Sequence, residues 1–362
     1  MSGNETKYGA IYESLKADIV GGYRTGRLPS EAMLVRRFGC SRITVVRALR
    51  ELCASGLAVR QKGRGTFVAE GARGRVGPIG VVIPISRGEM FPPLCQAITK
   101  QAQQDHRSVC LADLMAGTSG DMLAVAKRVM GDFLLQKVAG VVFQLADGVP
   151  EAARMNKAAL DMLSAANMPV VLVDCDVERH PRRSGYDVIG SDDFDAGYRM
   201  ARHMAERGAR RIAYLMPRFG NSSFQDRGRG IMAATGELGA HGIAKEGVFE
   251  SVAAVRRFVR SFKPDAIVCG NDRLAATLMP SLAEMGVRIP EDLLLGGFDD
   301  VNFARLVTPG LTTMHRPCHE IGEVAYKMLL ERIANPGLRP RHIRLSAYLV
   351  ERDSTRRSAA SS

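Results

Sequence analysis

Basic side chains near the N-terminus have the spacing of a helix that could contact nucleic acid. Apolar residues recur there at intervals of three and four, which predicts one buried stripe along a helix that begins after Ser41. Arg47 and Arg50 would point directly away from this stripe. Arg42 and Thr44 would flank it in the first helical turn. Guanidinium groups on such a face can bind base edges and phosphates, although a surface helix with solvated arginines shows the same pattern.

A basic turn that contains glycine follows this helix. It consists of Lys62, Gly63, Arg64 and Gly65, and the segments on either side predict a β-hairpin. Glycine permits close approach of the backbone to DNA, and the two basic side chains can neutralise phosphates or enter the minor groove. Together with the short turn before Ser41, the hairpin predicts a winged helix-turn-helix.

The rest of the chain contains candidate catalytic and metal-binding side chains. Asp174 and Asp176 follow a predicted strand, at the edge where α/β sheets bind ligands without catalysing a reaction. No Gly-x-Gly-x-x-Gly follows the first strand, and neither a phosphate-binding loop nor a Gly-x-Ser-x-Gly motif occurs. His180, His315 and His319 lie in separate loops without metal-ligand spacing. We therefore expect no enzyme, no catalytic residue, no cofactor and no metal.

The charge of the N-terminal region fits a polyanionic partner, and it fits an ordinary solvated basic surface equally well. The chain has 362 residues and a formal net charge of +12. Residues 1–75 carry 14 Lys and Arg against 6 Asp and Glu, which is two thirds of that excess. Seven scattered cysteines without Cys-x-x-Cys spacing indicate a reduced protein. With no apolar run long enough for a membrane span and no signal-peptide core, we expect a cytoplasmic protein with no membrane partner.

Strand-like and helix-like segments alternate after residue 78. This alternation predicts parallel sheets with helices on both faces, as in a Rossmann enzyme, a response-regulator-like domain or a two-lobed binding protein. We expect a DNA-binding domain at 1–70, a Gly- and Arg-rich linker at 71–78, a larger domain at 79–353 and a disordered tail at 354–362. Strands are predicted at 79–83, 108–111, 140–143, 170–173, 188–189, 211–215, 266–268 and 293–295. Helices are predicted near 92–104, 121–136, 151–166, 193–207, 225–239, 252–261, 273–285 and 319–334.

The N-terminal region resembles the winged helix-turn-helix of the GntR regulator family over about residues 8–69. The resemblance is carried by Leu28-Pro-Ser-Glu31, Phe38-Gly-Cys-Ser-Arg-Ile-Thr-Val45, Gly56-Leu57 and Gly63-Arg-Gly-Thr-Phe-Val68. It implies that two segments bind DNA, the start and outer face of the helix and the basic turn: Ser41, Arg42, Thr44, Arg47, Arg50, Lys62, Gly63, Arg64 and Gly65. The family usually has arginine directly after Thr-Val, whereas this chain has Val46 and then Arg47. That shift moves the charge about 100° around the helix, so the operator of other members cannot be carried over.

The larger domain resembles the effector-binding domain of the lactose-repressor family, which shares its fold with periplasmic sugar-binding proteins. The matching segments include Ile79-Gly-Val-Val-Ile-Pro84, Pro169-Val-Val-Leu-Val-Asp174, Cys269-Gly-Asn-Asp272, Gly297-Phe-Asp-Asp300 and Leu311-Thr-Thr313. The resemblance implies an α/β fold with two parallel-sheet lobes of the type I periplasmic-binding-protein kind, so that the whole chain resembles the arabinose-repressor type of architecture. We expect lobe 1 at about 79–185 and 317–345, and lobe 2 at about 186–316 and 346–353.

The same resemblance implies a ligand site between the lobes. The matching positions are Phe91, Gln144, Asp174, Arg227, Asn271, Asp299 and Arg316. Carboxylates, amides and guanidinium groups hydrogen-bond hydroxyl groups, and an aromatic ring covers the C–H face of a sugar. Arg316 stands where many members have glutamine, which favours an anionic or more oxygen-rich ligand. Structural roles stay open, because Asp299 could form an Asx turn and Asn271 could cap a helix.

These features predict a ligand-responsive transcriptional repressor that binds a two-fold double-stranded DNA operator as a homodimer. The ligand is expected to be a sugar or sugar derivative that weakens DNA binding through linkage. The chain has no tryptophan, a residue that commonly stacks on sugars, so a purine or nucleoside effector or corepressor is the alternative. A third hypothesis is an enzyme or transport-linked binding protein with an incidental basic region.

Overall fold

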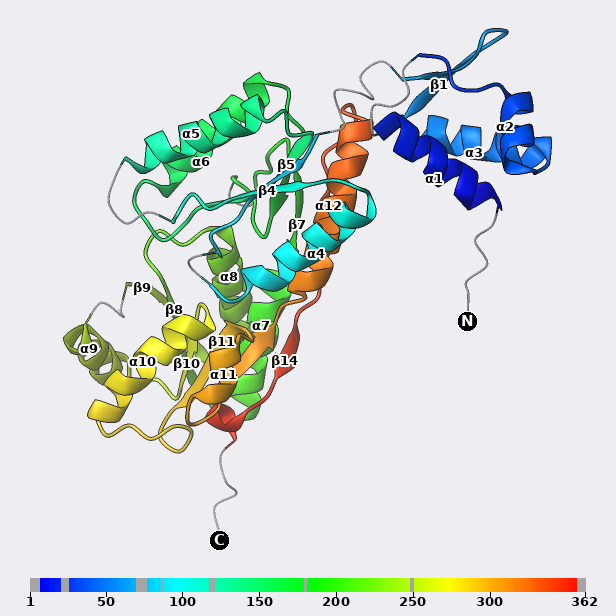
Figure 1. The fold of residues 1–362 in the computed structure, drawn as a ribbon. Coiled ribbons are helices and arrows are strands. Elements are labelled where there is room, and N and C mark those ends of the chain that lie inside the picture. Colours follow the sequence, from blue (N-terminus) through cyan, green and yellow to red (C-terminus); the bar gives the residue numbers. More distant parts are fainter. Residues whose placement is uncertain are drawn as a thin grey trace.

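A small N-terminal domain lies beside one end of a larger, two-lobed body (Figure 1). The computed structural model describes residues 7–20, 26–69, 77–85, 88–116, 121–178, 181–247 and 251–356. Most of the predicted linker at 71–78 lies outside these ranges. Within them, no helix has both the length and the apolar character that a membrane span requires.

The N-terminal domain consists of three helices and a two-stranded antiparallel hairpin. The elements are α1 (Lys7–Val20), α2 (Glu31–Phe38), α3 (Arg42–Ala54), β1 (Ala58–Gln61) and β2 (Gly65–Val68). This order confirms the predicted winged helix-turn-helix fold.

Local side-chain caps define where the second and third helices begin. The Ser30 hydroxyl accepts a hydrogen bond from the Met33 N–H, and the Ser41 hydroxyl accepts one from the Thr44 N–H. Gly39 ends α2 in the left-handed conformation, with a φ of 57°, which glycine adopts without a Cβ clash. The predicted apolar stripe of α3 is buried and packs with apolar residues of α1 and α2: Val45, Ala48, Leu49 and Leu52.

Lobe 1 is built on a six-stranded parallel sheet in the order β13-β7-β6-β5-β3-β4. Its strands are β3 (Ile79–Val82), β4 (Val109–Ala112), β5 (Gly140–Gln144), β6 (Val170–Val173), β7 (Asp187–Ser191) and β13 (His342–Leu345). Helices α4 (Phe91–Gln104) and α12 (Cys318–Ala334) pack on one face, and α5 (Met122–Leu135) and α6 (Ala152–Ala165) pack on the other. Two separate apolar clusters therefore lie on the two faces of the sheet.

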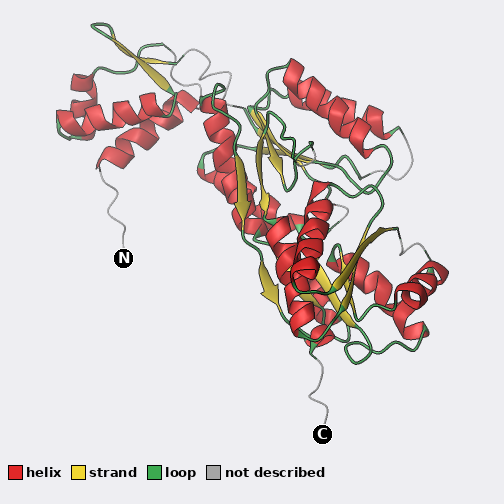
Figure 2. Ribbon diagram, turned by 180° about the vertical axis from the view of Figure 1, so that it is seen from behind, coloured by secondary structure: helices red, strands yellow, loops and turns green. Residues whose placement is uncertain are grey.

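Lobe 2 repeats this plan with the strand order β14-β12-β11-β10-β8-β9. Its strands are β8 (Arg211–Met216), β9 (His241–Glu246), β10 (Ala266–Cys269), β11 (Leu294–Asp299), β12 (Thr312–His315) and β14 (Tyr348–Val350). Helices α7 (Asp193–Glu206) and α8 (Ser222–Glu237) cover one face, and α9 (Val252–Phe262), α10 (Asp272–Glu284) and the short α11 (Asn302–Leu306) cover the other. Figure 2 shows the strands of both lobes enclosed between helices. Among the described strands of the body, β14 alone departs from the predicted parallel arrangement, because it pairs antiparallel with β12.

Two predicted boundaries in the body are wrong. The lobe boundary at 185/186 falls too early, since β7 pairs in parallel with β6 and β13 and so belongs to lobe 1. The predicted tail from 354 also starts too early, because Ser354 and Thr355 are fully buried. The Ser354 hydroxyl donates to the Leu295 carbonyl oxygen at 2.6 Å and accepts from the Thr312 N–H at 2.8 Å, which fixes this segment to lobe 2. Residues 357–362 lie outside the described part of the chain.

Candidate ligand cleft and nucleic-acid interface

A cavity of about 580 Å³ lies between the lobes and is lined by the carboxyl ends of strands from both. This is where parallel α/β sheets commonly bind ligands. All seven residues predicted from the sequence line this one cavity: Phe91, Gln144, Asp174, Arg227, Asn271, Asp299 and Arg316.

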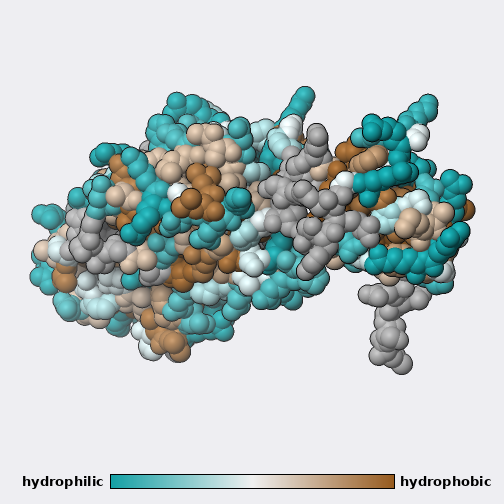
Figure 3. Space-filling model, turned by 45° about the horizontal axis from the view of Figure 1, so that its top comes forward, coloured by the Kyte–Doolittle hydropathy of each residue, from teal (hydrophilic) through white to brown (hydrophobic). Residues whose placement is uncertain are grey.

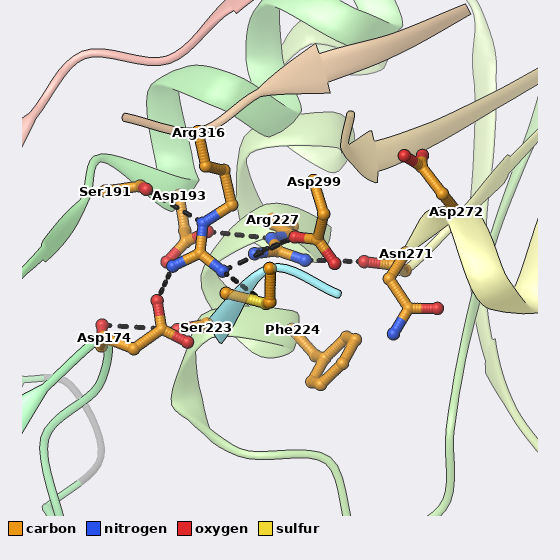
Figure 4. Close-up of polar contacts among 12 residues, drawn as sticks. Asp174, Ser191, Asp193, Ser223, Phe224, Arg227, Asn271, Asp272, Asp299 and Arg316 are labelled. Carbon is orange, nitrogen blue, oxygen red and sulfur yellow. Dashed lines mark hydrogen bonds and ion pairs between the residues drawn. The ribbon is translucent and has the colours of Figure 1, made fainter. Parts of the chain in front are cut away.

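Arg316 lies in the crossover between β12 of lobe 2 and α12 of lobe 1, and only 4 % of it is exposed. Its Nε donates to the Ser191 hydroxyl at 3.0 Å. Its guanidinium group forms an ion pair with Asp174 of lobe 1 and lies 3.4 Å from Oδ1 of Asp299 in lobe 2 (Figure 4). One buried cation thus joins carboxylates of opposite lobes.

Arg227 projects from α8 into the same cavity. Its Nε donates to Oδ1 of Asp193 at 2.8 Å, its Nη1 donates to the Gly270 carbonyl oxygen at 2.6 Å, and its Nη2 lies 3.8 Å from Asp299 (Figure 4). Gly197 on α7 makes this arrangement possible, because a Cβ there would lie 2.1 Å from the Arg227 carbonyl oxygen. The two helices approach closely enough for Asp193 and Arg227 to pair.

The two arginines and three carboxylates form one buried network of ion pairs, in the order Asp174, Arg316, Asp299, Arg227, Asp193. Each guanidinium group is thus paired with carboxylates of the protein itself. Burial raises the pKa of the Asp299 carboxyl, and the charge of Arg227 opposes that rise. The negative charge of these three carboxylates is therefore balanced mainly by Arg227 and Arg316.

One buried acceptor oxygen in the cavity has no hydrogen-bond partner among the described residues, in contrast to the paired guanidinium groups. Gln144 ends β5 and is 4 % exposed, and its Nε2 donates to Oδ2 of Asp174 at 3.4 Å. Its Oε1 is buried and has no hydrogen-bond partner among the described residues. Buried polar atoms are normally paired, so this oxygen is available to a donor on a ligand.

The structural alternatives raised by the sequence prove compatible with a place in the cavity. Asn271 does cap a helix, since its Oδ1 accepts from the Leu274 N–H at 2.9 Å, and it also lines the cleft. Asp299 and Asp300 both have positive φ values, of 105° and 53°. Asp300 turns away to pair with Arg352 and with His315, whereas Asp299 lines the cavity.

The two described histidines that were considered as metal ligands, His315 and His319, have separate partners. His315 stacks on Tyr348, with ring centroids 4.5 Å apart, and His319 lies 3.9 Å from Glu323 on α12. His180 lies outside the described residues. The described part of the chain contains no cluster of metal-ligating side chains.

Several cavity residues were not predicted from the sequence. Ser191 and Asp193 orient the two arginines, and Phe224 on α8 adds an aromatic wall. Asp147 and Asn221 join the lobes at the rim, with Nδ2 of Asn221 donating to the Asp147 carboxylate at 2.7 Å. Ser191 and Asp193 lie within Ile189-Gly-Ser-Asp-Asp193, a segment that also resembles the lactose-repressor family, and this was the available signal for them. Their pairing with Arg316 and Arg227 could not be predicted from the sequence, because these partners lie far away in the chain.

The predicted DNA-binding residues lie on exposed parts of the N-terminal domain. Arg50 is exposed, and Arg47 is exposed beside the Tyr8 ring of α1, 4.6 Å from its centroid. In the hairpin turn, Gly63 and Gly65 have positive φ values, and Lys62 and Arg64 are exposed. In Figure 3, hydrophilic and apolar residues are interspersed on this domain and on the body.

Glu31 organises the basic side chains between α3 and the hairpin. Its carboxylate accepts from Nε of Arg42 at 2.8 Å and from Nη2 of Arg60 at 2.7 Å. These guanidinium groups hold the pKa of Glu31 below its usual range. Arg60 and the 81 % exposed Ile43, which follows Arg42 in the first turn of α3, were missed by the sequence analysis. A single exposed apolar residue in a basic helix was the available signal.

Comparisons with known proteins agree with this two-part architecture. Residues 7–68 match the family model of bacterial regulatory proteins, gntR family, and residues 201–355 match that of a periplasmic binding protein-like domain. The chain is a gntR-type DNA-binding domain joined to a periplasmic binding protein-like effector domain.

Individual proteins also match about three quarters of this chain. The chain is 28 % identical over 284 residues to the HTH-type transcriptional repressor PurR of Escherichia coli O1:K1, covering 76 % of this chain and 79 % of that one. The transcription regulator CcpA of Lactococcus lactis has the same fold, with a TM-score of 0.65 at 19 % identity over 77 % of this chain and 99 % of its own. A periplasmic binding protein/LacI transcriptional regulator from Alkaliphilus metalliredigens, solved with D-xylulofuranose, has a TM-score of 0.63 at 20 % identity. The match covers 78 % of this chain and 100 % of that one.

The chain is therefore a DNA-binding transcriptional repressor of the general type of these relatives, with an effector domain. The relatives are transcription regulators rather than enzymes, in agreement with the expectation from the missing catalytic motifs.

Proposed function

We propose that the repressor binds a neutral, hydroxyl-rich ligand of monosaccharide size between its lobes, and that this ligand controls its affinity for an operator. The observation that carries the proposal is the buried pairing of Arg316 with Asp174 and Asp299 in the cavity between the lobes. The paired charges favour a neutral ligand, and the unpaired Oε1 of Gln144 favours a ligand that donates a hydrogen bond.

A ligand that donates hydrogen bonds fits the cavity best. The buried Oε1 of Gln144 and the carboxylates of Asp174 and Asp299 are acceptors, whereas the donors of Arg227 and Arg316 already have partners. A hydroxyl group donates one hydrogen bond and accepts others, so it can satisfy the acceptors without displacing the arginines. A polyol or sugar presents several such groups at once.

Anionic ligands are disfavoured by the same geometry. The sequence analysis left open an anionic or an oxygen-rich ligand, because Arg316 carries a positive charge. That charge is shared by two carboxylates, and a further buried anion beside them would lack a cation of its own. The balance supports the oxygen-rich, neutral alternative.

The apolar walls support the face of a ring. Phe91 and Phe224 line the cavity and are each 8 % exposed. The structural neighbour from Alkaliphilus metalliredigens was solved with a sugar, D-xylulofuranose. Because aromatic walls also suit a purine or nucleoside, that class is the second candidate, and a screen distinguishes the two.

Regulation would follow from linkage between ligand and DNA. We expect the N-terminal domains of a homodimer to read the two halves of a two-fold operator. A ligand that favours one lobe arrangement changes operator affinity, and DNA changes ligand affinity by the same factor. An inducer weakens operator binding and a corepressor strengthens it.

A thermal-shift screen of the full chain against monosaccharides, polyols, sugar acids and nucleosides tests the proposal. A ligand at about 100 times its Kd adds roughly 2.7 kcal/mol to the stability of the folded state. We expect one stereospecific neutral sugar or polyol to give this shift, and Asp299→Asn to abolish it. Asp292→Asn is the matched control, since Asp292 pairs with Arg288 on the surface of lobe 2. A response to a nucleoside alone would replace the sugar proposal with the second candidate.

A further inference from the structure

Two helices run side by side from the ligand cleft to the N-terminal domain. Helix α4 begins at Phe91, which lines the cleft, and α12 begins at Cys318, two residues after Arg316. The helices pack closely, because a Cβ at Gly322 of α12 would lie 2.6 Å from the Leu94 carbonyl oxygen of α4. Figure 1 shows α12 ending next to α1, with α4 alongside α12. The pair therefore spans lobe 1 from the cleft to the N-terminal domain.

The cleft ends of the two helices are tied to each other. Met90 is the residue before α4 and lines the cavity, and its Sδ lies 3.4 Å from Nη1 of Arg316. Any ligand that contacts Phe91 or changes the position of Arg316 acts on the first turn of α4 and on the segment that enters α12. Helices are stiff over this length, so a displacement at one end reaches the other.

The far ends meet the N-terminal domain at one carboxylate. Asp105 follows α4 directly, and it accepts from Nζ of Lys16 on α1 and from the hydroxyl of Tyr326 on α12, each at 2.9 Å. Lys16 and Asp105 are each 23 % exposed. Burial lowers the pKa of Lys16, but the hydrogen bond and charge of Asp105 outweigh it and raise the net value. Asp105 thus joins α1, α4 and α12.

A second contact lies beside this carboxylate. Gly56, just after α3, packs on the last residue of α12, where an added Cβ would lie 3.4 Å from the Ala334 carbonyl oxygen. A small groove here is lined by both parts of the chain, including Tyr12, Leu57 and Ile333. The docked side of the N-terminal domain is formed by α1 and the end of α3. The side chains predicted to bind DNA remain exposed: Arg42, Arg50, Lys62 and Arg64.

We propose that Asp105 is a positioning residue for DNA binding, which holds the N-terminal domain on lobe 1 in the orientation that binds the operator. The α4–α12 pair then links this orientation to the cleft, a step that rests on the proposed function of the cleft. Because the Lys16–Asp105 pair is partly exposed, its loss by itself costs the fold little stability. Replacing Asp105 also removes the acceptor of the Tyr326 hydroxyl, so the role of the ion pair is read from variants that change its charges.

Asp105→Lys is the decisive variant, because charge and position predict opposite outcomes. The probe is a duplex selected by the wild-type full chain from a random-sequence pool, and binding is measured by fluorescence anisotropy at fixed salt. Added positive charge alone strengthens DNA binding. Loss of the docked orientation weakens it, and we expect at least about a fivefold weaker Kd, the lower end of typical coupling between sites.

Matched variants separate position from charge. Asp132→Lys makes the same charge change on an exposed position of α5, and we expect operator binding equal to or tighter than wild type. Combining Lys16→Glu with Asp105→Lys reverses the pair and restores the wild-type Kd to within about twofold. Asp105→Asn keeps the side-chain shape and removes the charge, and we expect it to weaken operator binding as well. It replaces Asp105→Lys in the comparison if the lysine variant does not fold.

Two results would overturn the inference. One is an operator Kd for Asp105→Lys equal to that of Asp132→Lys, and the other is failure of the charge reversal to restore binding. Repeating the titrations with the sugar found in the screen tests the link to the cleft: the effect of the sugar on operator Kd shrinks in Asp105→Lys. If the sugar leaves wild-type operator binding unchanged, the proposed function fails, and the sugar-free comparison still decides the role of Asp105.

Discussion

Replacing Arg316 by methionine tests the buried network of ion pairs at the centre of the cleft. Methionine keeps most of the aliphatic volume and removes the charge, so Asp174 and Asp299 lose their shared cation. Asp299 retains Arg227 at 3.8 Å, whereas the one other described side chain that bonds to the Asp174 carboxylate is the Gln144 amide, at 3.4 Å. Breaking one side of a buried ion pair typically costs about 3–5 kcal/mol. We expect Arg316→Met to lower the free energy of unfolding by this amount.

Adding Asp174→Asn to the methionine variant provides the matched control. The double variant removes the uncompensated carboxylate, so its loss of stability is smaller than the sum of the two single losses. We expect a coupling energy of about 2–3 kcal/mol, at the upper end for residues in contact. Urea unfolding followed by far-UV circular dichroism suits this chain, which has no tryptophan for fluorescence. Losses that add to within about 0.5 kcal/mol would show that the ion pair is not what stabilises the cleft.

Three further predictions concern pH and DNA. Burial raises the pKa of Asp272 to about 7, above its ordinary 3.8, so the folded state holds a proton that the unfolded chain releases. Stability therefore falls as pH rises between these values, and chemical denaturation should show Asp272→Asn gaining about 2–3 kcal/mol relative to wild type from pH 5 to pH 7 and little above it. Ile43→Ala should abolish the affinity difference between operator duplexes with thymine and with uracil at one position, because the thymine methyl is the apolar feature of the major groove. Equal sensitivity to uracil in both proteins would exclude that contact. Glu31→Gln should weaken operator binding although it makes the chain more basic, because Arg42 and Arg60 lose the carboxylate that orients them; unchanged anisotropy titrations would contradict this role.

Local sequence signals determined the elements and the positions of the site residues. Apolar periodicity after Ser41 predicted the helix that carries Arg47 and Arg50, because such signals act within one or two turns. The alternation of strands and helices predicted sheets covered on both faces. The family resemblance predicted seven residues for one ligand site, including Asp174 after β6 and Asp299 at the end of β11, and all seven line one cavity.

Tertiary contacts alone decided how these elements combine. β7 belongs to lobe 1 because it pairs with β13, more than 140 residues later, and Ser354 is buried because it bonds to Leu295. The oxygen partners of Arg316 are Asp174, Ser191 and Asp299, all far from it or from each other in the sequence, so no local pattern could show that its charge is already balanced. The same holds for Asp105, whose partners Lys16 and Tyr326 meet only after the N-terminal domain docks on the body. Sequence determines which groups are available, whereas burial and distance determine which of them pair.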